Sequence, residues 1–432
     1  MGDYWDERWE TLELEEMEKF QLLRLKEQVK WAYEKIPFYK HSFDAKGVKP
    51  ADLESLEDIK NFPFTLKTDL RYNYPFGFCS VSMDEVARIH VSSGTTGKPI
   101  ISFYTKEDID QWTECMARGL WAQGIRPNDI VQNTYSMGLF TGGLGFHQGS
   151  ERIGCAVIPA SAGITERQIM LMEDFGATVL FSTPTYALTI AERAEKLGKD
   201  IRKFPLKIGC FGAEPWTVSM RKEIEQRMGI KAHEHYGLTE LMGPGVSFSC
   251  EDYKLHINED HIYPEIIDPV TEKPLPLGSQ GELVLTALQR KAMPLIRYRT
   301  RDITTLRREE CSCGRRLIMM DKVLGRSDDM LIVKGVNIFP SQIEDIIMSF
   351  SDMIEPHYLI HLKRKGYMDI ITVDCEAKID LFNAGKEKIK ELEKSISNRL
   401  FETIGIDIPI RIVEPESIIR SEGKAKRVID ER

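Results

Sequence analysis

The chain has 432 residues, of which 42% are hydrophobic, and a formal net charge of -9. Such a length allows roughly two or three domains with their own cores, and the composition excludes an intrinsically disordered chain. An acidic chain without a long block of Lys or Arg is not typical of a nucleic-acid-binding protein, so we expect no nucleic-acid partner.

The N-terminal stretch is acidic, and no run of about 18 apolar residues occurs, so we expect neither a signal peptide nor insertion into a membrane. The eight cysteines are scattered, and only Cys311 and Cys313 lie close together. This spacing does not resemble a secreted disulfide framework. We therefore expect a cytoplasmic enzyme.

The first predicted element is a long amphipathic segment from about Asp6 to Lys40, which we interpret as packing structure because its apolar residues recur at helical spacing. A Ser/Thr/Gly-rich stretch, VSSGTTGKPI, follows at Val91 to Ile100. Backbone N–H groups, hydroxyls and one ammonium in such a run suit a bound phosphate. Its spacing excludes the common G-x-x-x-x-G-K-[ST] loop. A helix is predicted from Thr105 to about Gly124, so we expect the loop to lie between a strand and a helix.

Further along, the apolar segments CAVIPA, TVLFST and LKIGCFGA alternate with helical stretches, which is typical of an α/β sheet. Ligands of such sheets gather at the strand ends. A strand at GELVLTAL adds β structure to the second half of the chain.

After Gly325 the pattern changes to a strand, a helix, two strands around a turn, another helix and a last strand. We therefore predict an α/β fold with a large N-terminal domain, residues 1–326, and a small mobile C-terminal α+β domain, residues 327–432. The polar join GRSDD could absorb a large backbone change, so the small domain is interpreted as a lid.

Six short motifs occur in order along the chain: SSGTTGKP, GAEPW, YGLTE, YRTRD, GRSDD and GKAKR. As a set they resemble the adenylate-forming acyl-CoA synthetases, and the segments TGGLGFHQGSERIGCAVIPASAGITERQ and DDMLIVKGVNIFPSQIE are similar to the phenylacetate–coenzyme A ligases among them. The resemblance covers nearly the full length. It implies that an aryl carboxylic acid attacks ATP to form an acyl-adenylate and pyrophosphate, and that coenzyme A then displaces AMP.

The resemblance also assigns roles to individual residues. A nucleotide site is implied at Ser92, Ser93, Gly94, Thr95, Thr96, Gly97, Lys98, Gly212, Ala213, Glu214, Pro215, Glu234, His235, Tyr236, Gly237, Asp302 and Arg326. Catalytic roles fall to Lys424, Thr239 and Glu240, with Glu240 holding Mg²⁺. The acid pocket is formed by Tyr135, Phe140, Ala213 and Gly237, and the hinge and coenzyme A loop by Asp328, Lys334, Gly335 and Val336. A homodimer is implied as well.

Cys250, His256, Cys311 and Cys313 form a separate candidate set, with three thiols and one imidazole. That is the donor set of a structural Cys₃His zinc site, although the C-x-C spacing is tighter than usual. The alternative interpretation is that these cysteines are small buried hydrophobic residues.

Three positions depart from the family pattern: Gln148 replaces a usual tyrosine, Ala162 a usual glycine, and Arg301 a glycine before Asp302. The acid is therefore open between phenylacetate, indoleacetate, hydroxyphenylacetate and related aromatic acids, with phenylacetate our first hypothesis. Two rival functions stay open. One keeps adenylation but uses a carrier-protein thiol or a deazaflavin as acceptor, and the other is a nucleotide sensor without catalysis.

Overall fold

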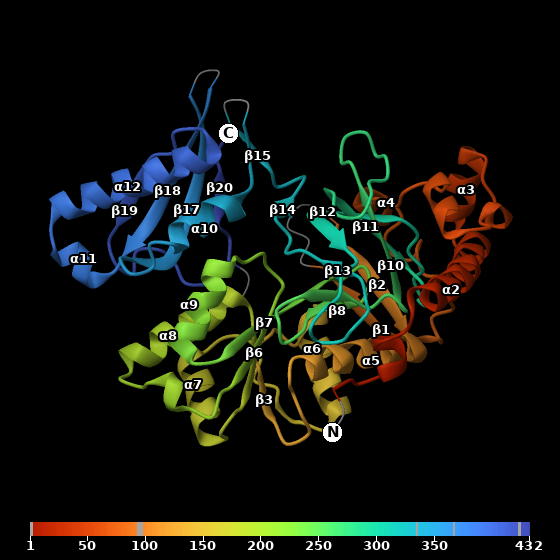
Figure 1. Ribbon diagram of the computed structural model, residues 1–432, viewed down its shortest axis with the longest axis horizontal. Helices are drawn as coiled ribbons and strands as arrows, with labels where there is room; N and C mark the ends of the chain where they lie inside the picture. The colour runs from red at the N-terminus through yellow and green to blue at the C-terminus, as the bar shows by residue number, and fades with distance from the viewer. Residues whose placement is uncertain (1–2, 93–97, 334–335, 366–367, 422–424) are drawn as a thin grey trace.

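The computed structural model describes residues 3–92, 98–333, 336–365, 368–421 and 425–432, and the following concerns these residues (Figure 1). A large domain built on one long sheet is followed by a small domain that lies beside it at the C-terminal end of the chain. The α/β class and the division into a large and a small domain are as the sequence predicts.

The predicted N-terminal amphipathic segment is helical but divided into three helices. They are α1 (Glu7–Glu10), α2 (Leu14–Lys35) and α3 (Pro37–Lys46). Pro37 ends the longer helix and begins the next, because it lacks an N–H and suits the first helical position. The apolar face of α2 packs into the main core, with Leu25 and Val29 fully buried. Two 3₁₀ turns, Pro50–Asp52 and Leu56–Asn61, and α4 (Lys67–Tyr72) complete this region.

The glycine-rich phosphate loop connects two strands, β1 (Val86–Val91) and β2 (Ile101–Thr105), which pair antiparallel. The sequence-based placement between a strand and a helix was therefore wrong. The helix is present as α5 (Lys106–Ala122), but it begins directly after β2, where the Thr105 hydroxyl caps it by accepting from the Asp108 N–H over 3.1 Å. Thr105 is both the last residue of β2 and the N-cap of α5, so no Gly- or Pro-containing turn marks the boundary between strand and helix in the sequence.

The central sheet has twelve strands, eleven of them in the order β10-β11-β12-β13-β9-β8-β7-β6-β5-β3-β4, with β14 paired to β12. Its parallel half contains β3 (Ile130–Asn133), β4 (Ala156–Ile158), β5 (Val179–Ser182), β6 (Ile208–Phe211) and β7 (Lys231–Leu238). Its antiparallel half contains β8 (Gly243–Ser249), β9 (Leu255–Ile257), β10 (Ile262–Ile267), β11 (Gln280–Ala287), β12 (Tyr298–Arg307), β13 (Met319–Met320) and β14 (Gly325–Arg326). The predicted strands at residues 155–160, 178–183, 206–213 and 281–288 are confirmed.

Helices cover both sides of the parallel half (Figure 1). On one side lie α5 and α6 (Thr141–Ile153), which pack on each other and on β8. On the other side α8 (Pro184–Lys196) packs between α7 (Thr165–Asp174) and α9 (Val218–Met228), and a 3₁₀ turn follows at Ile201–Lys203. Parallel strands covered on both faces are buried throughout, and β5 and β6 are.

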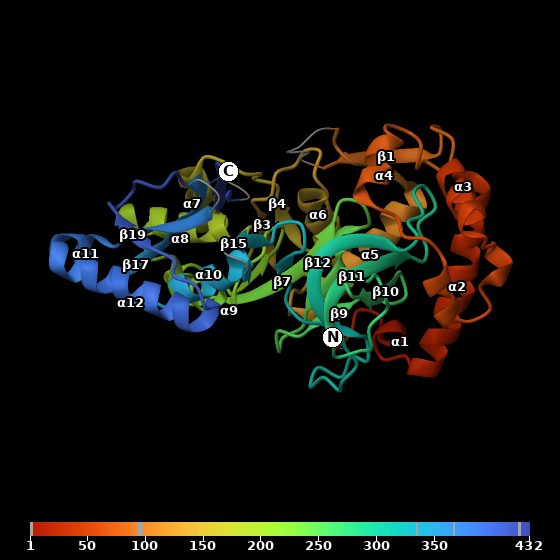
Figure 2. The same cartoon turned by 90° about the horizontal axis from the view of Figure 1, so that it is seen from above.

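The small domain has its own hydrophobic core. Its elements are β15 (Leu331–Val333), β16 (Val336–Ile338), α10 (Pro340–Met348), β17 (Ile354–Lys365), β18 (Met368–Ala377), α11 (Ile379–Asn383), α12 (Lys386–Ile404), β19 (Ile410–Val413) and β20 (Val428–Asp430). Four strands form a sheet in the order β19-β18-β17-β20. Helix α10 contacts α9 of the large domain, and seen from above the small domain extends from the α7–α9 side (Figure 2).

In the part of the chain that the structure describes, no helix combines the length and the apolar character that crossing a bilayer requires. The two longest helices, α2 and α12, are both rich in charged residues.

Candidate active site

Polar side chains from three strands, together with a glycine that follows a fourth strand, lie where the two halves of the sheet join. Gly212 directly follows β6, Tyr236 lies on β7, Asp302 on β12 and Arg326 on β14. Gly212 and Tyr236 lie at the carboxyl ends of the parallel strands β6 and β7, the edge at which α/β folds bind ligands, and the antiparallel pair β12 and β14 brings Asp302 and Arg326 to the same place. The sequence-predicted motifs GAEPW, YGLTE, YRTRD and GRSDD are thus brought to one place by the sheet.

Asp302 is at the centre of this group. The Tyr236 hydroxyl donates to its carboxylate over 2.6 Å, and a guanidinium nitrogen of Arg326 lies 4.0 Å from the other oxygen. The register of β12 and β14 places Asp302 opposite Arg326. Burial raises the pKa of Asp302 to about 6, although Tyr236 and Arg326 both lower it. The carboxylate oxygens are acceptors for a pair of hydroxyls, as in a ribose.

Glu240 comes two residues after the end of β7 and is buried, with 5% of its surface exposed. The Tyr298 hydroxyl donates to its carboxylate over 3.0 Å, and the Lys67 ammonium lies 3.5 Å from the same oxygen. Because Oε2 makes neither of these contacts, the carboxylate keeps an oxygen for a hard cation such as Mg²⁺. The neighbouring Thr239 is half-buried.

Two glycines allow the backbone to approach closely beneath the site. A Cβ at Gly237 would stand 1.4 Å from the Gly243 carbonyl oxygen, and one at Gly212 would stand 2.4 Å from the His235 carbonyl oxygen. Neither position has room for a side chain. Ala213, which follows Gly212, has a φ of 71°, a left-handed conformation that non-glycine residues adopt rarely.

The remaining members of the two central motifs have different environments. Glu214 accepts hydrogen bonds from two backbone amides, Thr185 over 2.8 Å and Ala425 over 3.0 Å, whereas Pro215 is exposed. Glu234 pairs with the Lys322 ammonium over 2.9 Å. His235 is buried with both ring nitrogens in hydrogen-bond contact, and burial lowers its pKa to about 4. Its imidazole is therefore a neutral packing group here.

The two aromatic residues predicted for the acid pocket differ in burial. Tyr135 is buried and stacks on Phe146 with ring centroids 5.0 Å apart, and Phe146 also contacts the His235 ring edge-on. Phe140, by contrast, is the residue directly before α6, makes no capping hydrogen bond through its side chain, and is 42% exposed. Phe146 was not among the residues that the sequence singled out.

The ends of the phosphate loop are described, but its middle is not. Ser92 is tied to Ile100 by two hydrogen bonds, and the Lys98 ammonium lies 5.4 Å from the Tyr74 ring centroid. Asp328 holds the Arg326 guanidinium through two bonds of 2.8 Å, and Val336 begins β16. The predicted site residues outside the described ranges are Ser93, Gly94, Thr95, Thr96, Gly97, Lys334, Gly335 and Lys424.

The structure also brings residues to the site that sequence reasoning missed. Lys67 and Tyr298 contact Glu240, Thr185 contacts Glu214, and Lys322 contacts Glu234. Tyr298 stands inside the YRTRD motif, so the motif itself carried a signal. The other three lie in segments remote from their partners, and only the fold brings them close.

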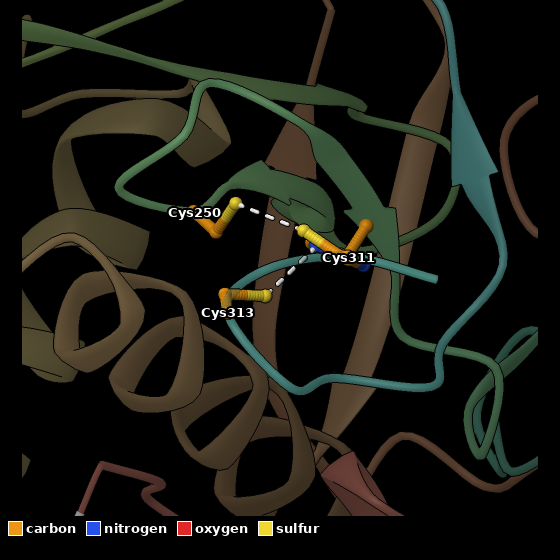
Figure 3. A group of neighbouring side chains, drawn as sticks. Cys250, Cys311 and Cys313 are labelled. Carbon is orange, nitrogen blue, oxygen red and sulfur yellow. Dashed lines mark hydrogen bonds between the residues drawn. The ribbon is translucent and has the colours of Figure 1, made fainter. Parts of the chain in front are cut away.

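The second predicted set converges as expected. Cys250 follows β8, His256 lies on β9, and Cys311 and Cys313 lie between β12 and β13, with one donor atom from each residue all within 4.8 Å of one another (Figure 3). The Sγ atoms of Cys250 and Cys311 are 3.8 Å apart, too far for a disulfide. Two Zn–S bonds of about 2.3 Å meeting at a tetrahedral angle would separate the sulfurs by about 3.8 Å. The geometry therefore fits a tetrahedral zinc ion.

His256 is oriented for this role. Its Nδ1 lies 3.3 Å from the Leu317 carbonyl oxygen, to which Nδ1–H donates, and Nε2 faces the Cys313 sulfur at 3.4 Å. A backbone acceptor on the outer nitrogen is the usual way in which a metal-binding imidazole is fixed. The N-terminal segment packs on the same loop, because the Arg315 guanidinium donates to fully buried Glu10 over 2.6 Å.

The fold and the site together define a nucleotide-dependent enzyme whose site lies between a large and a small domain. A family model described as AMP-binding enzyme matches residues 19–289, and one described as AMP-binding enzyme C-terminal domain matches residues 335–432. Phenylacetate-coenzyme A ligase of Aromatoleum evansii is 49% identical over 97% of this chain and 95% of its own length. The enzyme of the same name from Escherichia coli is 47% identical over 98% of this chain and 97% of its own.

A solved 2-hydroxyisobutyryl-CoA ligase is 30% identical and superposes in its postadenylation state with a TM-score of 0.95, covering 100% of this chain and 93% of that one. The same enzyme in its thioesterification state gives only 0.74, covering 99% and 92%. The two domains of this chain are therefore arranged as in the postadenylation state. The chain belongs to the AMP-binding enzyme family and, within it, to the group of phenylacetate–coenzyme A ligases.

Proposed function

We propose that this enzyme joins phenylacetate to coenzyme A at the expense of ATP, through an acyl-adenylate, releasing AMP and pyrophosphate. Its relatives at 49% and 47% identity carry that activity in their names. The observation that supports the proposal is the cluster of polar side chains formed by Asp302, Tyr236, Arg326 and Glu240. The two domains that flank this cluster have the postadenylation arrangement. Phenylacetate, ATP and coenzyme A are thus the proposed substrates.

In the first half-reaction a carboxylate oxygen of the acid attacks the α-phosphorus of ATP, and the bond to pyrophosphate breaks. We assign Asp302 to the two ribose hydroxyls, with Tyr236 beside the adenine and Arg326 near the nucleotide. Ser92, Lys98 and the loop between them would hold the phosphates. Glu240 would hold Mg²⁺, which neutralises phosphate charge when bound, and Thr239 would contact the α-phosphate.

Lys424 is the residue to which we assign the developing charge between the acyl carboxylate and the α-phosphate. It belongs to the small domain, which we place from residue 327 onward as a mobile lid. Rotation about Asp328 would withdraw Lys424 and bring the 334–336 segment to the site for coenzyme A. The coenzyme A thiol then attacks the acyl carbon, and AMP leaves with the electron pair of the broken C–O bond. One site thus serves both half-reactions.

An aryl acid as the substrate agrees with the aromatic side chains and glycines described above. The stacked Tyr135 and Phe146 rings and the closely approaching backbone at Gly212 and Gly237 favour a flat apolar group. We propose phenylacetate before indoleacetate and hydroxyphenylacetate because the ligases at 49% and 47% identity are named for it.

The Cys250, His256, Cys311 and Cys313 set is proposed to hold zinc in a structural role. All four positions of a tetrahedral ion would be filled by protein, which leaves none for a substrate. The set also joins β8 and β9 to the loop before β13. We also keep the homodimer as a proposal, to be checked by sedimentation.

The deciding experiment is pyrophosphate release across a panel of aryl and aliphatic acids, each with and without coenzyme A, with the acyl thioester measured in parallel. We expect phenylacetate to support turnover that rises sharply when coenzyme A is added. Adenylation that responds only to a carrier protein or a deazaflavin would replace the proposed acceptor. ATP binding without pyrophosphate release from any acid would favour a nucleotide sensor.

A further inference from the structure

Described residues on both sides of positions 422–424, near the C-terminus, contact helix α8 of the large domain. Glu416 pairs with Lys196 over 2.6 Å, Arg420 with Glu192 over 2.9 Å, and the Arg427 guanidinium lies 3.3 Å from the Thr185 hydroxyl. Thr185, Glu192 and Lys196 are seven and four residues apart, so they lie on one face of the helix. The order of contacts along α8 is the reverse of their order along this C-terminal segment.

Glu214 contacts both this C-terminal segment and the N-terminus of α8. Its Oε1 accepts the Thr185 N–H over 2.8 Å and its Oε2 accepts the Ala425 N–H over 3.0 Å. Thr185 is the second residue of α8, so its N–H has no acceptor within the helix, and it is only 3% exposed. A carboxylate is also favoured there by the helix dipole. One side chain thereby joins the large domain to the small one.

The Ala425 N–H that Glu214 holds lies next to a residue of the proposed catalytic machinery. Ala425 directly follows Lys424, the residue assigned to the first half-reaction. Arg427, two residues further on, contacts the same Thr185 that Glu214 holds. The contact exists in the postadenylation arrangement of the domains, which differs from the thioesterification arrangement, with TM-scores of 0.95 and 0.74.

We propose that Glu214 is a positioning residue for the first half-reaction. It holds the backbone beside Lys424 against the N-terminus of α8 during adenylation, and the contact is released before coenzyme A reacts. The inference rests on the proposed function, and it gives Glu214 a role other than binding the nucleotide.

The test measures the two half-reactions separately in Glu214→Gln. The amide keeps the size of the side chain but offers one acceptor and one donor to two N–H groups, so one contact is lost. We expect kcat for pyrophosphate release with phenylacetate to fall about tenfold or more, while KM for ATP changes less than about twofold. Thioester formation from supplied phenylacetyl-adenylate and coenzyme A should stay within about twofold.

Ser219→Ala is the matched control, because Ser219 makes a 2.8 Å bond to Asp345 of the small domain at a different place on the interface. It should leave both half-reactions within about twofold. A raised KM for ATP in Glu214→Gln with an unchanged kcat would place Glu214 on the nucleotide instead. Equal losses in both half-reactions would reduce Glu214 to a structural residue.

A second readout does not depend on the substrate. Hydrogen exchange of the peptide containing Ala425 should be faster in Glu214→Gln than in the unaltered protein, while peptides from the small-domain strand β18 exchange equally in both. Unchanged exchange at Ala425 would overturn the proposal even if adenylation were impaired. If the unaltered protein adenylates no acid, the proposed function fails, and the exchange experiment still decides whether Glu214 docks the segment.

Discussion

Asp302 combines two opposed influences on one carboxyl group. Burial favours its protonated form, whereas the Tyr236 hydroxyl and the Arg326 guanidinium favour the carboxylate. The rise in pKa from 3.8 to about 6 corresponds to about 3 kcal/mol. Because the folded-state pKa is above the unfolded value, this group stabilises the fold below about pH 4, and that contribution is lost as the pH rises through about 6.

The first prediction concerns binding of adenosine, which carries a ribose but no phosphate that titrates in this range. Its affinity for the protein should fall as the pH is lowered through about 6, because a protonated Asp302 accepts fewer hydrogen bonds from the ribose hydroxyls. Calorimetry between pH 5 and 8 measures the change. Asp302→Asn should bind weakly and without this pH dependence; an unchanged pH profile in that variant would remove Asp302 from the ribose.

The second prediction concerns Glu240. Glu240→Gln should lower the rate of pyrophosphate release about a hundredfold and raise the Mg²⁺ concentration needed for half-maximal rate, because a neutral amide is a weaker ligand than a carboxylate. Titration of Mg²⁺ in the adenylation assay measures both effects. Glu85→Gln, at an exposed surface pair with Lys291, should leave both unchanged. An unaltered Mg²⁺ requirement in Glu240→Gln would place the cation elsewhere.

At the scale of residues, the sequence indicated which side chains belong to the candidate site better than it indicated which residues they contact. Asp302, Tyr236 and Glu240 could be proposed from the sequence because each stands inside a short motif, and the fold brings these motifs together. The partners of Glu214 could not be found, since Thr185 and Ala425 belong to no shared pattern and contribute only backbone amides. Arg301 has a φ of 69°, which gives a physical reason for the glycine expected there.

At the scale of elements, the Cys250, His256, Cys311 and Cys313 set connects the adjacent strands β8 and β9 with the loop between β12 and β13. Cys311→Ser should remove stoichiometric zinc and lower the melting temperature by about 5 °C or more, because metal binding contributes directly to folding. Metal analysis and thermal unfolding of the purified variant test this. Cys79→Ser, whose thiol lies outside the set and contacts the Val81 carbonyl, should keep the metal. A zinc-free parent protein would end the assignment.

The elements themselves were largely predictable. Strands such as β5 and β6 are short apolar runs bounded by turns, and α12 has a clear helical period. The error occurred at β2, where a strand continues directly into a helix. Periodicity over five residues does not distinguish the end of a strand from the start of a helix, and strand pairing is a non-local property.

For the whole molecule, the proposed rotation about Asp328 has a direct test. Asp328→Pro fixes φ at this position and should therefore slow thioester formation from supplied phenylacetyl-adenylate about tenfold or more. Adenylation should stay within about twofold, since the domains already have the postadenylation arrangement. Asp328→Ala, which leaves the backbone free, should affect the two half-reactions alike. A Pro variant that slows adenylation and spares thioester formation would contradict the hinge.

The bond between Glu10 and Arg315 also bears on how the chain is made. These residues are 305 positions apart, and Glu10 is fully buried. At a synthesis rate of about 5 to 20 residues per second, Glu10 waits roughly 15 to 60 s for its partner to be added to the chain. During translation the Glu10 carboxylate therefore has only its local backbone partners, the Trp5 and Asp6 amides, until most of the chain has been made, and the contact that fixes the N-terminal segment to the Arg315 loop forms late.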